Sequence, residues 1–378
     1  MGRTVAIGIQ DFEKIRRGNY FYVDKTDFIR EWWESGDDVT LIARPRRFGK
    51  TLNISMLEYF FSINYKDRGD LFEGLSIWND EKYRQLQGTY PVISLSFASV
   101  KERNFEMTRK KICQLIANLY DKNSFLLSSG VMKENDIRYF KRVSEEMDDS
   151  DASLSLHQLA DYLSRYYGKK VIILLDEYDT PMQEAYVNGF RNEIVAFTRN
   201  LFNSTFKTNP YLERAIMMGI TRVSKESIFS DLNNLKVITT TSDEYASAFG
   251  FTEKEVFAAL EECGYSDQKK CVKQWYDGFV LGLMVDLADR YIITSNRESG
   301  FGRYDIMIEP KQKEAEAFII EFKVFNPRRE ASLEETVQNA LAQIEEKKYA
   351  AELIKRGIAE EHINKYGFAF KGKEVLIG

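Results

Sequence analysis

The chain has 378 residues, of which 44% are hydrophobic and 29% charged, a composition typical of a folded globular protein with room for two or three domains. Its formal net charge of −5 excludes a general basic surface for nucleic acid, so any contact with DNA or RNA would use local Lys and Arg patches. No apolar run approaches the roughly 18 residues of a membrane helix, and no signal peptide is predicted. Three widely spaced cysteines without a Cys-x-x-Cys pair predict free thiols in a reducing cytoplasm.

Strand and helix patterns alternate over the first 250 residues. Short apolar runs predict strands at 39–43, 92–97, 171–176, 215–221 and 237–241. Several of these runs are apolar on both faces, as the strands of a covered parallel sheet are. Helical patterns lie between them, for example at 51–62 and 192–202. The alternation predicts a doubly wound α/β domain over residues 1–250.

The pattern changes after this domain. A short charged helical segment is predicted over residues 251–278, with Thr252 as its N-cap and Glu255 three residues on. A small α/β unit is then predicted over residues 279–378. Its expected elements are a buried helix at 279–291, strands at 291–298, 303–310 and 317–325, a long polar helix at 333–357, and strands at 366–372 and 374–378.

The segment RPRRFGKT ends like a phosphate-binding loop. In the pattern G-x-x-x-x-G-K-[ST], Gly49, Lys50 and Thr51 fit the last three places, but Arg44 stands at the first glycine. The segment joins a predicted strand to a predicted helix, whose unpaired N–H groups favour phosphate. Lys50 is expected to neutralise phosphates and Thr51 to bind Mg²⁺. The predicted ATP-binding residues of the loop are Arg47, Phe48, Gly49, Lys50, Thr51 and Leu52. The alternative is a basic turn that contains GKT by chance.

The segment VIILLDEYDTP supplies a second nucleotide-site pattern. An apolar strand that ends in Asp176 and Glu177 is typical of a strand carrying a magnesium carboxylate and an adjacent base. Asp176 is therefore expected to hold Mg²⁺, and Glu177 to activate the attacking water. Thr221 and Arg222 follow another predicted strand and are candidate sensors of the γ-phosphate. The alternative for Asp176 and Glu177 is a buried strand that ends in an exposed acidic turn. The alternative for Thr221 and Arg222 is that they are ordinary residues at the end of a strand.

A metal-dependent nuclease pattern lies in the C-terminal unit. Asp305 precedes Glu321 and Lys323, and the last two share one face of a predicted strand because side chains alternate along a strand. Two carboxylates that hold Mg²⁺ or Mn²⁺, with a lysine that positions water, suit phosphodiester attack. Glu321 and Lys323 also interrupt an apolar strand, where unpaired charge is costly. The alternative is an ion pair at the sheet edge.

Longer motifs resemble a known family. Four segments of the chain resemble a bacterial AAA-ATPase-like family: YFYVDKTDFI, RPRRFGKTLNISML, LLDEYDTPM and GITRVSKESIFSDLNNLKV. The PD-(D/E)XK nuclease-like module that follows this ATPase in the same proteins resembles SNRESGFGRYDIMI and AFIIEFKV. The resemblance implies that Arg44 is a family feature. It also implies an ATP and Mg²⁺ site at Lys50, Thr51, Asp176 and Glu177, a nuclease-like centre at Asp305, Glu321 and Lys323, and a polar partner, Gln343.

The resemblance implies a Mg²⁺-dependent ATPase coupled to a nuclease-like module acting on DNA or RNA, with homo-oligomers as an option. The alternative is a nucleotide-binding switch or interaction protein with an inactive nuclease fold. One departure favours it: the family members carry a long helical region between the two modules, whereas QWYDGF here runs directly into VLGLMVDL. Gln274 and Asp277 stand where the family tends to carry an acid and a histidine. A deletion product without an independent role is a third interpretation.

Overall fold

The computed structural model describes residues 8–262 and 291–378, apart from 221–228, 230, 231, 241, 296, 297, 300, 301, 314, 328, 372 and 373. Its contacts divide the chain into two units, Met1–Gly264 and Tyr265–Gly378. The predicted domain bounds, 1–250, 251–278 and 279–378, stay a prediction, because residues 263–290 lie outside the described residues. The helix predicted at 279–291 also lies there, except for its last residue.

A parallel sheet forms the centre of the N-terminal unit, as predicted. Its described strands are β1 (Val39–Ala43), β2 (Val92–Ser96), β3 (Val171–Asp176), β4 (Leu212–Gly219) and β5 (Leu235–Ile238), in the order β2-β3-β4-β1-β5. Every pairing among them is parallel. β1 and β3 have the predicted bounds, whereas β4 begins three residues earlier than predicted.

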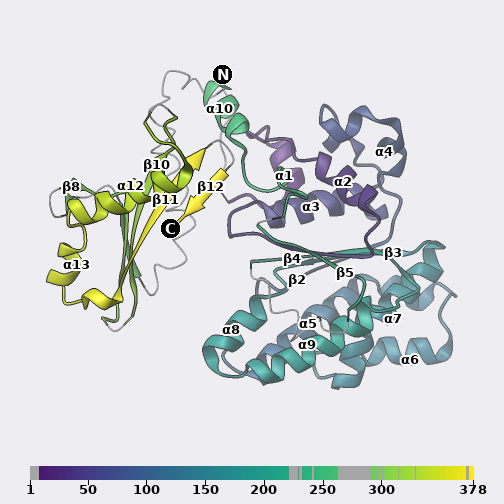
Figure 1. Ribbon diagram of the computed structural model, residues 1–378. Helices are drawn as coiled ribbons and strands as arrows, with labels where there is room; N and C mark the ends of the chain where they lie inside the picture. Colours follow the sequence, from purple (N-terminus) through teal and green to yellow (C-terminus); the bar gives the residue numbers. More distant parts are fainter. Residues whose placement is uncertain are drawn as a thin grey trace. The chain divides into compact units, whose positions relative to one another are not determined.

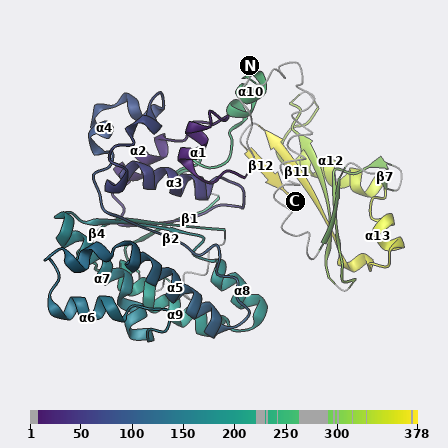
Figure 2. The same cartoon turned by 180° about the vertical axis from the view of Figure 1, so that it is seen from behind.

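Helices cover both faces of this sheet (Figure 1). One face carries α1 (Phe12–Arg17), α2 (Asp27–Ser35), α3 (Lys50–Phe61) and α4 (Glu81–Leu86). The other carries α5 (Phe105–Lys122), α6 (Glu134–Arg142), α7 (Asp149–Tyr167), α8 (Thr180–Asn188) and α9 (Arg191–Phe206), and the reverse view in Figure 2 shows the same layers. Short 3₁₀ segments lie at Ile63–Tyr65, Gly69–Phe72, Ser76–Asn79 and Ser124–Ser128.

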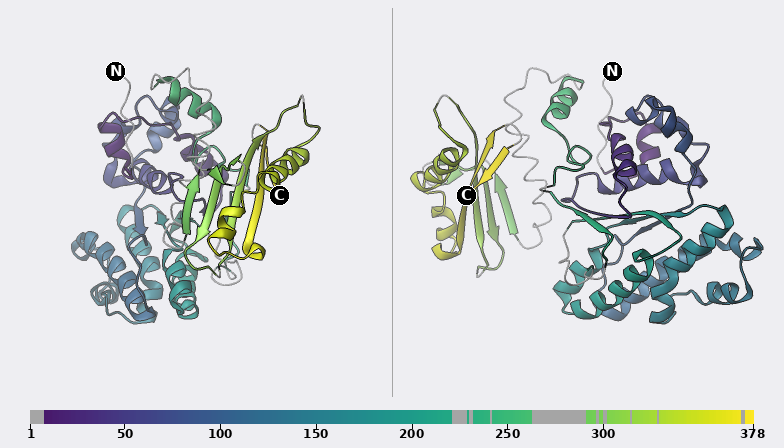
Figure 3. Two further views of the ribbon diagram at one scale, coloured as in Figure 1. Left: turned by 90° about the vertical axis from the view of Figure 1, so that its left-hand side faces the viewer. Right: turned by 45° about the vertical axis from the view of Figure 1, so that its right-hand side comes forward.

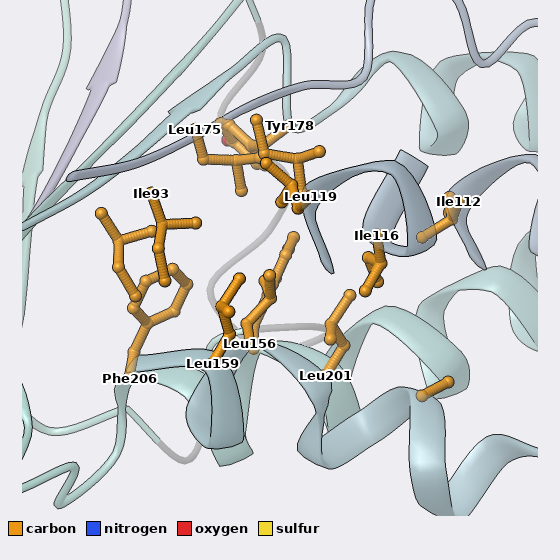
Figure 4. Close-up of a cluster of buried hydrophobic side chains, with 14 of the residues drawn as sticks. Ile93, Ile112, Ile116, Leu119, Leu156, Leu159, Leu175, Tyr178, Leu201 and Phe206 are labelled. Atoms are coloured by element: carbon orange, nitrogen blue, oxygen red, sulfur yellow. The ribbon is translucent and has the colours of Figure 1, made fainter. Parts of the chain in front are cut away.

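The two faces of the sheet build two separate hydrophobic clusters. Side chains alternate along β3, so Ile173 and Leu175 join the cluster under α5, α7 and α9, while Ile172 and Leu174 join the cluster under α1 to α3. Figure 4 shows Ile93 and Leu175 of the strands facing Leu159 and Leu201 of the helices. Because both faces are covered, β1 and β3 are almost entirely apolar, and their positions could be predicted from the sequence.

The last described helix of this unit, α10 (Glu253–Glu262), begins with the predicted capping arrangement. Glu255 N donates to Thr252 Oγ1 at 3.3 Å, and Thr252 N donates to Glu255 Oε2 at 2.7 Å. Lys25 Nζ also donates to Glu255 at 2.7 Å, which ties the start of α10 to the N-terminal unit. The N-cap prediction is confirmed.

A mixed sheet forms the C-terminal unit. Its described strands are β6 (Tyr291–Ser295), β9 (Ile306–Pro310), β10 (Ala317–Val324), β11 (Ile363–Lys371) and β12 (Glu374–Ile377), in the order β12-β11-β10-β9-β6. β10 and β11 are parallel, and the other pairs are antiparallel. β7 (Glu298–Ser299) and β8 (Gly302–Arg303) form a separate small ladder, and a 3₁₀ turn lies at Glu360–His362.

Two helices, α12 (Leu333–Glu346) and α13 (Ala351–Lys355), pack on one face of this sheet, drawn in yellow-green in Figure 3. The prediction of one helix over 333–357 is therefore wrong. Lys348 adopts a left-handed backbone, φ +52°, between the two helices. Ile344 and Tyr349 are both buried in the same cluster, yet five positions along a continuous helix would point about 140° apart. The interruption lets both side chains reach the core.

Candidate functional site

The predicted phosphate-binding loop, residues 44–51, which we term the phosphate loop, connects the end of β1 to the start of α3. Gly49 is the N-cap of α3 with φ +78°, a left-handed backbone that glycine adopts without a Cβ clash. Arg47 also has a positive φ, +66°, and its side chain is exposed. Together they turn the chain so that the first N–H groups of α3 point out of the helix end, where they favour an anion.

Lys50 is the first residue of α3, and only 6% of its surface is exposed. Its Nζ donates to Arg44 O at 2.9 Å and to Pro45 O at 2.8 Å, so the ammonium is held inside the curve of the loop. Burial lowers the pKa of Lys50, while the nearby carboxylates of Asp176 and Asp179 act in the opposite direction. A cation held this way can transfer from main-chain carbonyls to phosphate oxygens.

Thr51 and Asp176 meet at the carboxyl end of the sheet. Thr51 Oγ1 donates to Asp176 Oδ2 at 2.8 Å, although the residues belong to α3 and β3. Asp176 is 2% exposed, and burial raises the pKa of its carboxyl to about 6, against the hydrogen bond from Thr51. A hydroxyl and a carboxylate are the hard oxygen ligands that Mg²⁺ prefers, so these two residues fit a metal beside the loop.

Glu177 leaves the strand directly after Asp176. Its backbone is left-handed, φ +50°, and its side chain is half-buried, with Oε2 accepting a 3.0 Å hydrogen bond from Thr180 Oγ1. Tyr178 N donates to Met218 O at 3.2 Å, which fixes the turn against β4. A non-glycine residue with positive φ is uncommon, and such residues are found at functional sites more often than elsewhere.

Asp179, which sequence reasoning missed, is the N-cap of α8, and its side chain packs against the end of β4. It is fully buried, its Oδ2 accepts from Ile220 N at 3.0 Å, and Gln183 Nε2 donates to the same oxygen at 2.8 Å. A Cβ on Gly219 would stand 2.6 Å from Asp179 Oδ1, so the approach depends on glycine. The signal in the sequence was the second aspartate of DEYD, three residues after Asp176. The candidate sensors Thr221 and Arg222 lie outside the described residues.

Phe48 and Leu52, the remaining predicted loop residues, are partly buried against the cluster under α1 to α3. Phe48 O accepts a hydrogen bond from Gly250 N at 3.2 Å. Their side chains therefore anchor the loop to the body of the unit. Their predicted contact with ATP could come only from their main-chain groups or from the exposed part of the side chains.

The nuclease-like residues lie on the face of the C-terminal sheet that α12 covers. In the antiparallel register, Ile320 pairs with Ile306, so the next pair along places Glu321 opposite Asp305. Both are buried, with 3% and 7% of their surfaces exposed. Asp305 Oδ2 accepts a 2.8 Å hydrogen bond from Phe322 N, which fixes that carboxylate against β10.

Gln343 of α12 links the acid and the lysine of this centre. Its Oε1 accepts from Lys323 Nζ at 2.7 Å, and its Nε2 donates to Glu321 Oε1 and, at 3.1 Å, to Tyr349 OH. Burial raises the pKa of Tyr349 above its ordinary value, while the hydrogen bond with Gln343 lowers it. Tyr349 was missed because the expected continuous helix turned it away from this face.

The alternative interpretation of these charges was an ion pair between Lys323 and Glu321 or Asp305. Among the described residues, Lys323 instead contacts the Gln343 amide, which in turn donates to Glu321. Within the described ranges, no group of three or more His, Cys, Asp or Glu side chains is placed to hold a metal. Two carboxylates nevertheless fit Mg²⁺, which usually keeps several waters and takes only one or two protein carboxylates. Asp305 and Glu321 are the pair that could supply them.

Two stretches of the chain match known families. Residues 6–229, more than half of the chain, match the family described as predicted AAA-ATPase. The chain belongs to the predicted AAA-ATPase family. Residues 273–378 match the PD-(D/E)XK nuclease superfamily. Both matches confirm the family resemblance stated from the motifs.

The chain is also similar to a curated protein named as an uncharacterized protein in the vnfD 5' region of Azotobacter chroococcum mcd 1, with 29% identity over 279 residues. The matched stretch covers 73% of this chain and 48% of that protein, so the chain spans about half the length of the curated relative.

In this member of the predicted AAA-ATPase family, the matched span 6–229 contains the phosphate loop, Asp176, Glu177 and Asp179. The nuclease superfamily match contains Asp305, Glu321, Lys323 and Gln343. The described helices include none with the length and apolarity to cross a membrane.

Proposed function

We propose that this protein binds ATP with Mg²⁺ at the loop between β1 and α3 and hydrolyses it. The observation that carries the proposal is the 2.8 Å hydrogen bond from Thr51 Oγ1 to Asp176 Oδ2, beside the buried ammonium of Lys50. These groups supply a metal-binding pair and a phosphate counter-charge at a helix N-terminus.

In the proposed reaction, Lys50 exchanges the Arg44 and Pro45 carbonyls for phosphate oxygens and so compensates their charge. Thr51 and Asp176 would hold Mg²⁺, which neutralises charge that develops on the transferred phosphoryl group. Glu177, already aligned by Thr180, orients the attacking water and accepts its proton. Thr221 and Arg222 would sense the γ-phosphate, and in a homo-oligomer an arginine of a neighbouring copy could complete the site.

For the C-terminal unit we propose metal-dependent cleavage of a phosphodiester bond in DNA or RNA. Asp305 and Glu321 would hold Mg²⁺ or Mn²⁺, which activates water and polarises the phosphate. Lys323 would orient that water or compensate charge on the phosphate, with Gln343 fixing its ammonium. Hydrolysis of ATP by the first unit would then switch or move this second unit.

The second candidate is a nucleotide-binding switch whose nuclease fold is inactive. The junction after Gly278 favours it, because QWYDGF runs directly into VLGLMVDL where the family members carry a long helical region. The two candidates differ in one measurable property: only the first cuts nucleic acid.

The nucleotide site is tested by binding of Mg²⁺–ATP to purified wild type, Lys50→Ala and Lys66→Ala. Lys66 is an exposed lysine outside the loop and serves as the matched control. Binding by wild type and Lys66→Ala, with none by Lys50→Ala, is the expected result. Equal binding by all three proteins would remove the loop assignment.

The nuclease is tested by incubating the protein with labelled single- and double-stranded DNA and RNA in the presence of Mg²⁺ or Mn²⁺. Cleavage should disappear in Asp305→Ala and in Lys323→Ala and persist in Lys365→Ala, a lysine of β11 in an exposed ion pair with Glu345. ATP binding without any cleavage by wild type would instead support the switch.

A further inference from the structure

A buried arginine stands at the entrance of the phosphate loop. Arg44 occupies the first-glycine position of the loop pattern, and only 4% of its surface is exposed. Its neighbours Arg46 and Arg47 are exposed. Burial of a guanidinium is costly unless its N–H groups find acceptors, so the partners of Arg44 indicate its role.

Three main-chain carbonyls accept from the guanidinium: Ala43 O, at 3.3 Å, belongs to the preceding residue, and the other two lie about 200 positions away in the chain. Arg44 Nη1 donates to Thr239 O, and Nη2 donates to Glu244 O at 3.4 Å. The Cζ atom lies 5.4 Å from the centroid of the Phe249 ring, within the range of a cation–π contact. The planar guanidinium spreads its five donors over a wider span than the compact ammonium of a lysine, so it suits separate carbonyls and a ring at once.

Thr239, Glu244 and Phe249 belong to residues 239–250, which make up most of the stretch between β5 and α10 and which we term the β5–α10 connection; residue 241 lies outside the described part. Two further hydrogen bonds join the connection to the phosphate loop and α3. Asn53 Nδ2 donates to Ala248 O at 2.9 Å, and Gly250 N donates to Phe48 O at 3.2 Å. The loop and the connection are therefore fastened to each other at several points, and Arg44 makes the contacts closest to β5.

The main chain of Arg44 belongs to the loop itself. Arg44 N donates to Gly219 O at 3.1 Å at the end of β4, and Arg44 O accepts from Lys50 Nζ at 2.9 Å. The residue whose side chain reaches the β5–α10 connection therefore also supplies one of the two carbonyls that hold Lys50. Arg44 thus contacts the β5–α10 connection through its side chain and the proposed phosphate counter-charge, Lys50, through its main chain.

We propose that Arg44 is a positioning residue of the nucleotide site: its guanidinium fastens the phosphate loop to the β5–α10 connection. The connection, instead of a glycine turn, then holds the loop in its binding shape. This inference rests on the proposed function for the identity of the ligand. It gives the departure from the glycine pattern a physical role, because a glycine at this position has no group to reach the connection.

The decisive variant is Arg44→Gly, which restores the loop pattern. Mg²⁺–ATP binding is measured by calorimetry for wild type, Arg44→Gly, Arg44→Lys and Arg103→Gly, at a temperature at which melting curves show each protein folded. Arg103 is an exposed arginine in the loop after β2 and serves as the matched control. We expect affinity to fall about 10- to 100-fold in Arg44→Gly, the loss typical of charged hydrogen-bond donors, and nearly as far in Arg44→Lys. Affinity within about twofold of wild type in either variant would overturn the inference.

Amide hydrogen exchange provides a readout without ATP. In ligand-free Arg44→Gly, amide exchange should accelerate in residues 46–53, which belong to the phosphate loop and the first turn of α3, and in the β5–α10 connection. The amides of β3 should keep their protection. Unchanged exchange in both segments overturns the inference. If wild type fails to bind ATP, the proposed function fails, and the exchange result still decides the role of Arg44. If Arg44→Gly does not fold, ATP binding and amide hydrogen exchange are both measured on Arg44→Lys instead.

Discussion

Thr51 and Asp176 are separated by 125 positions in the chain, and a 2.8 Å hydrogen bond joins Thr51 Oγ1 to Asp176 Oδ2. The bond brings the first turn of α3 to the end of β3, and it is possible because β4 alone separates β1 from β3 in the sheet. A buried carboxylate in this position has consequences for stability as well as for metal binding.

The stability of the nucleotide-free protein should depend on pH through Asp176. Burial raises the pKa of its carboxyl from the ordinary value of 3.8 to about 6. The folded state therefore prefers the protonated form, and this stabilisation is present below about pH 4 and is lost as the pH rises through about 6. The loss corresponds to about 3 kcal/mol in the free energy of unfolding.

Melting of wild type and Asp176→Asn between pH 5 and pH 8, without Mg²⁺ or ATP, checks this prediction. Asn cannot ionise and can still accept the hydrogen bond from Thr51, so the variant should gain stability relative to wild type as the pH rises. Asp67→Asn, at an exposed position, is the control and should show no such trend. A constant difference between Asp176→Asn and wild type at every pH would contradict the assignment.

Glu177→Gln should separate binding from hydrolysis. The amide keeps the size of the side chain but cannot accept a proton from water, so the rate of ATP hydrolysis should fall about 10²- to 10⁴-fold. The affinity for Mg²⁺–ATP should stay near that of wild type, since Glu177 is not among the proposed metal-binding residues. Single-turnover hydrolysis and equilibrium binding measure the two effects, with Glu184→Gln on α8 as control. Hydrolysis at the wild-type rate would exclude Glu177 as the base.

Gln343→Ala should weaken nuclease activity without removing either carboxylate. The change releases Glu321 and Lys323 from the amide that connects them. Loss of a partner that orients metal ligands typically costs about 10- to 100-fold in activity or metal affinity. Cleavage rates titrated with Mn²⁺ check this, and Gln338→Ala, at an exposed position of the same helix, should cleave like wild type. Equal rates for both variants would show that the amide does not support the centre.

Gly219→Ala should destabilise the end of β4. The added Cβ would lie 2.6 Å from both Asp179 Oδ1 and Tyr178 Cε1, closer than non-bonded atoms pack, and overpacking of this kind costs about 1–3 kcal/mol. Urea unfolding measures the loss. Part of it should disappear when Asp179→Ala is combined with Gly219→Ala, because the smaller side chain relieves one clash. Simple additivity of the two changes would argue against the close approach.

Local features of this protein follow from short windows of its sequence. Hydrophobic period and terminal residues within a short window predicted the bounds of β1 and β3 and the capping of α10 by Thr252 and Glu255. They also placed the start of α3 to within one residue. The family followed from the motifs for the same reason. The roles of the individual site residues stay predictions.

Which distant groups meet depends on how the strands and helices assemble. Lys348 breaks the expected helix because Tyr349 is buried beside Ile344, and that burial depends on a sheet assembled from strands far apart in the chain. In the sequence, Arg44 is a departure from the glycine pattern, whereas the structure gives it carbonyl partners after β5. Hydrophobic period reports which face of an element is buried, but the order in which strands pair determines what that face touches.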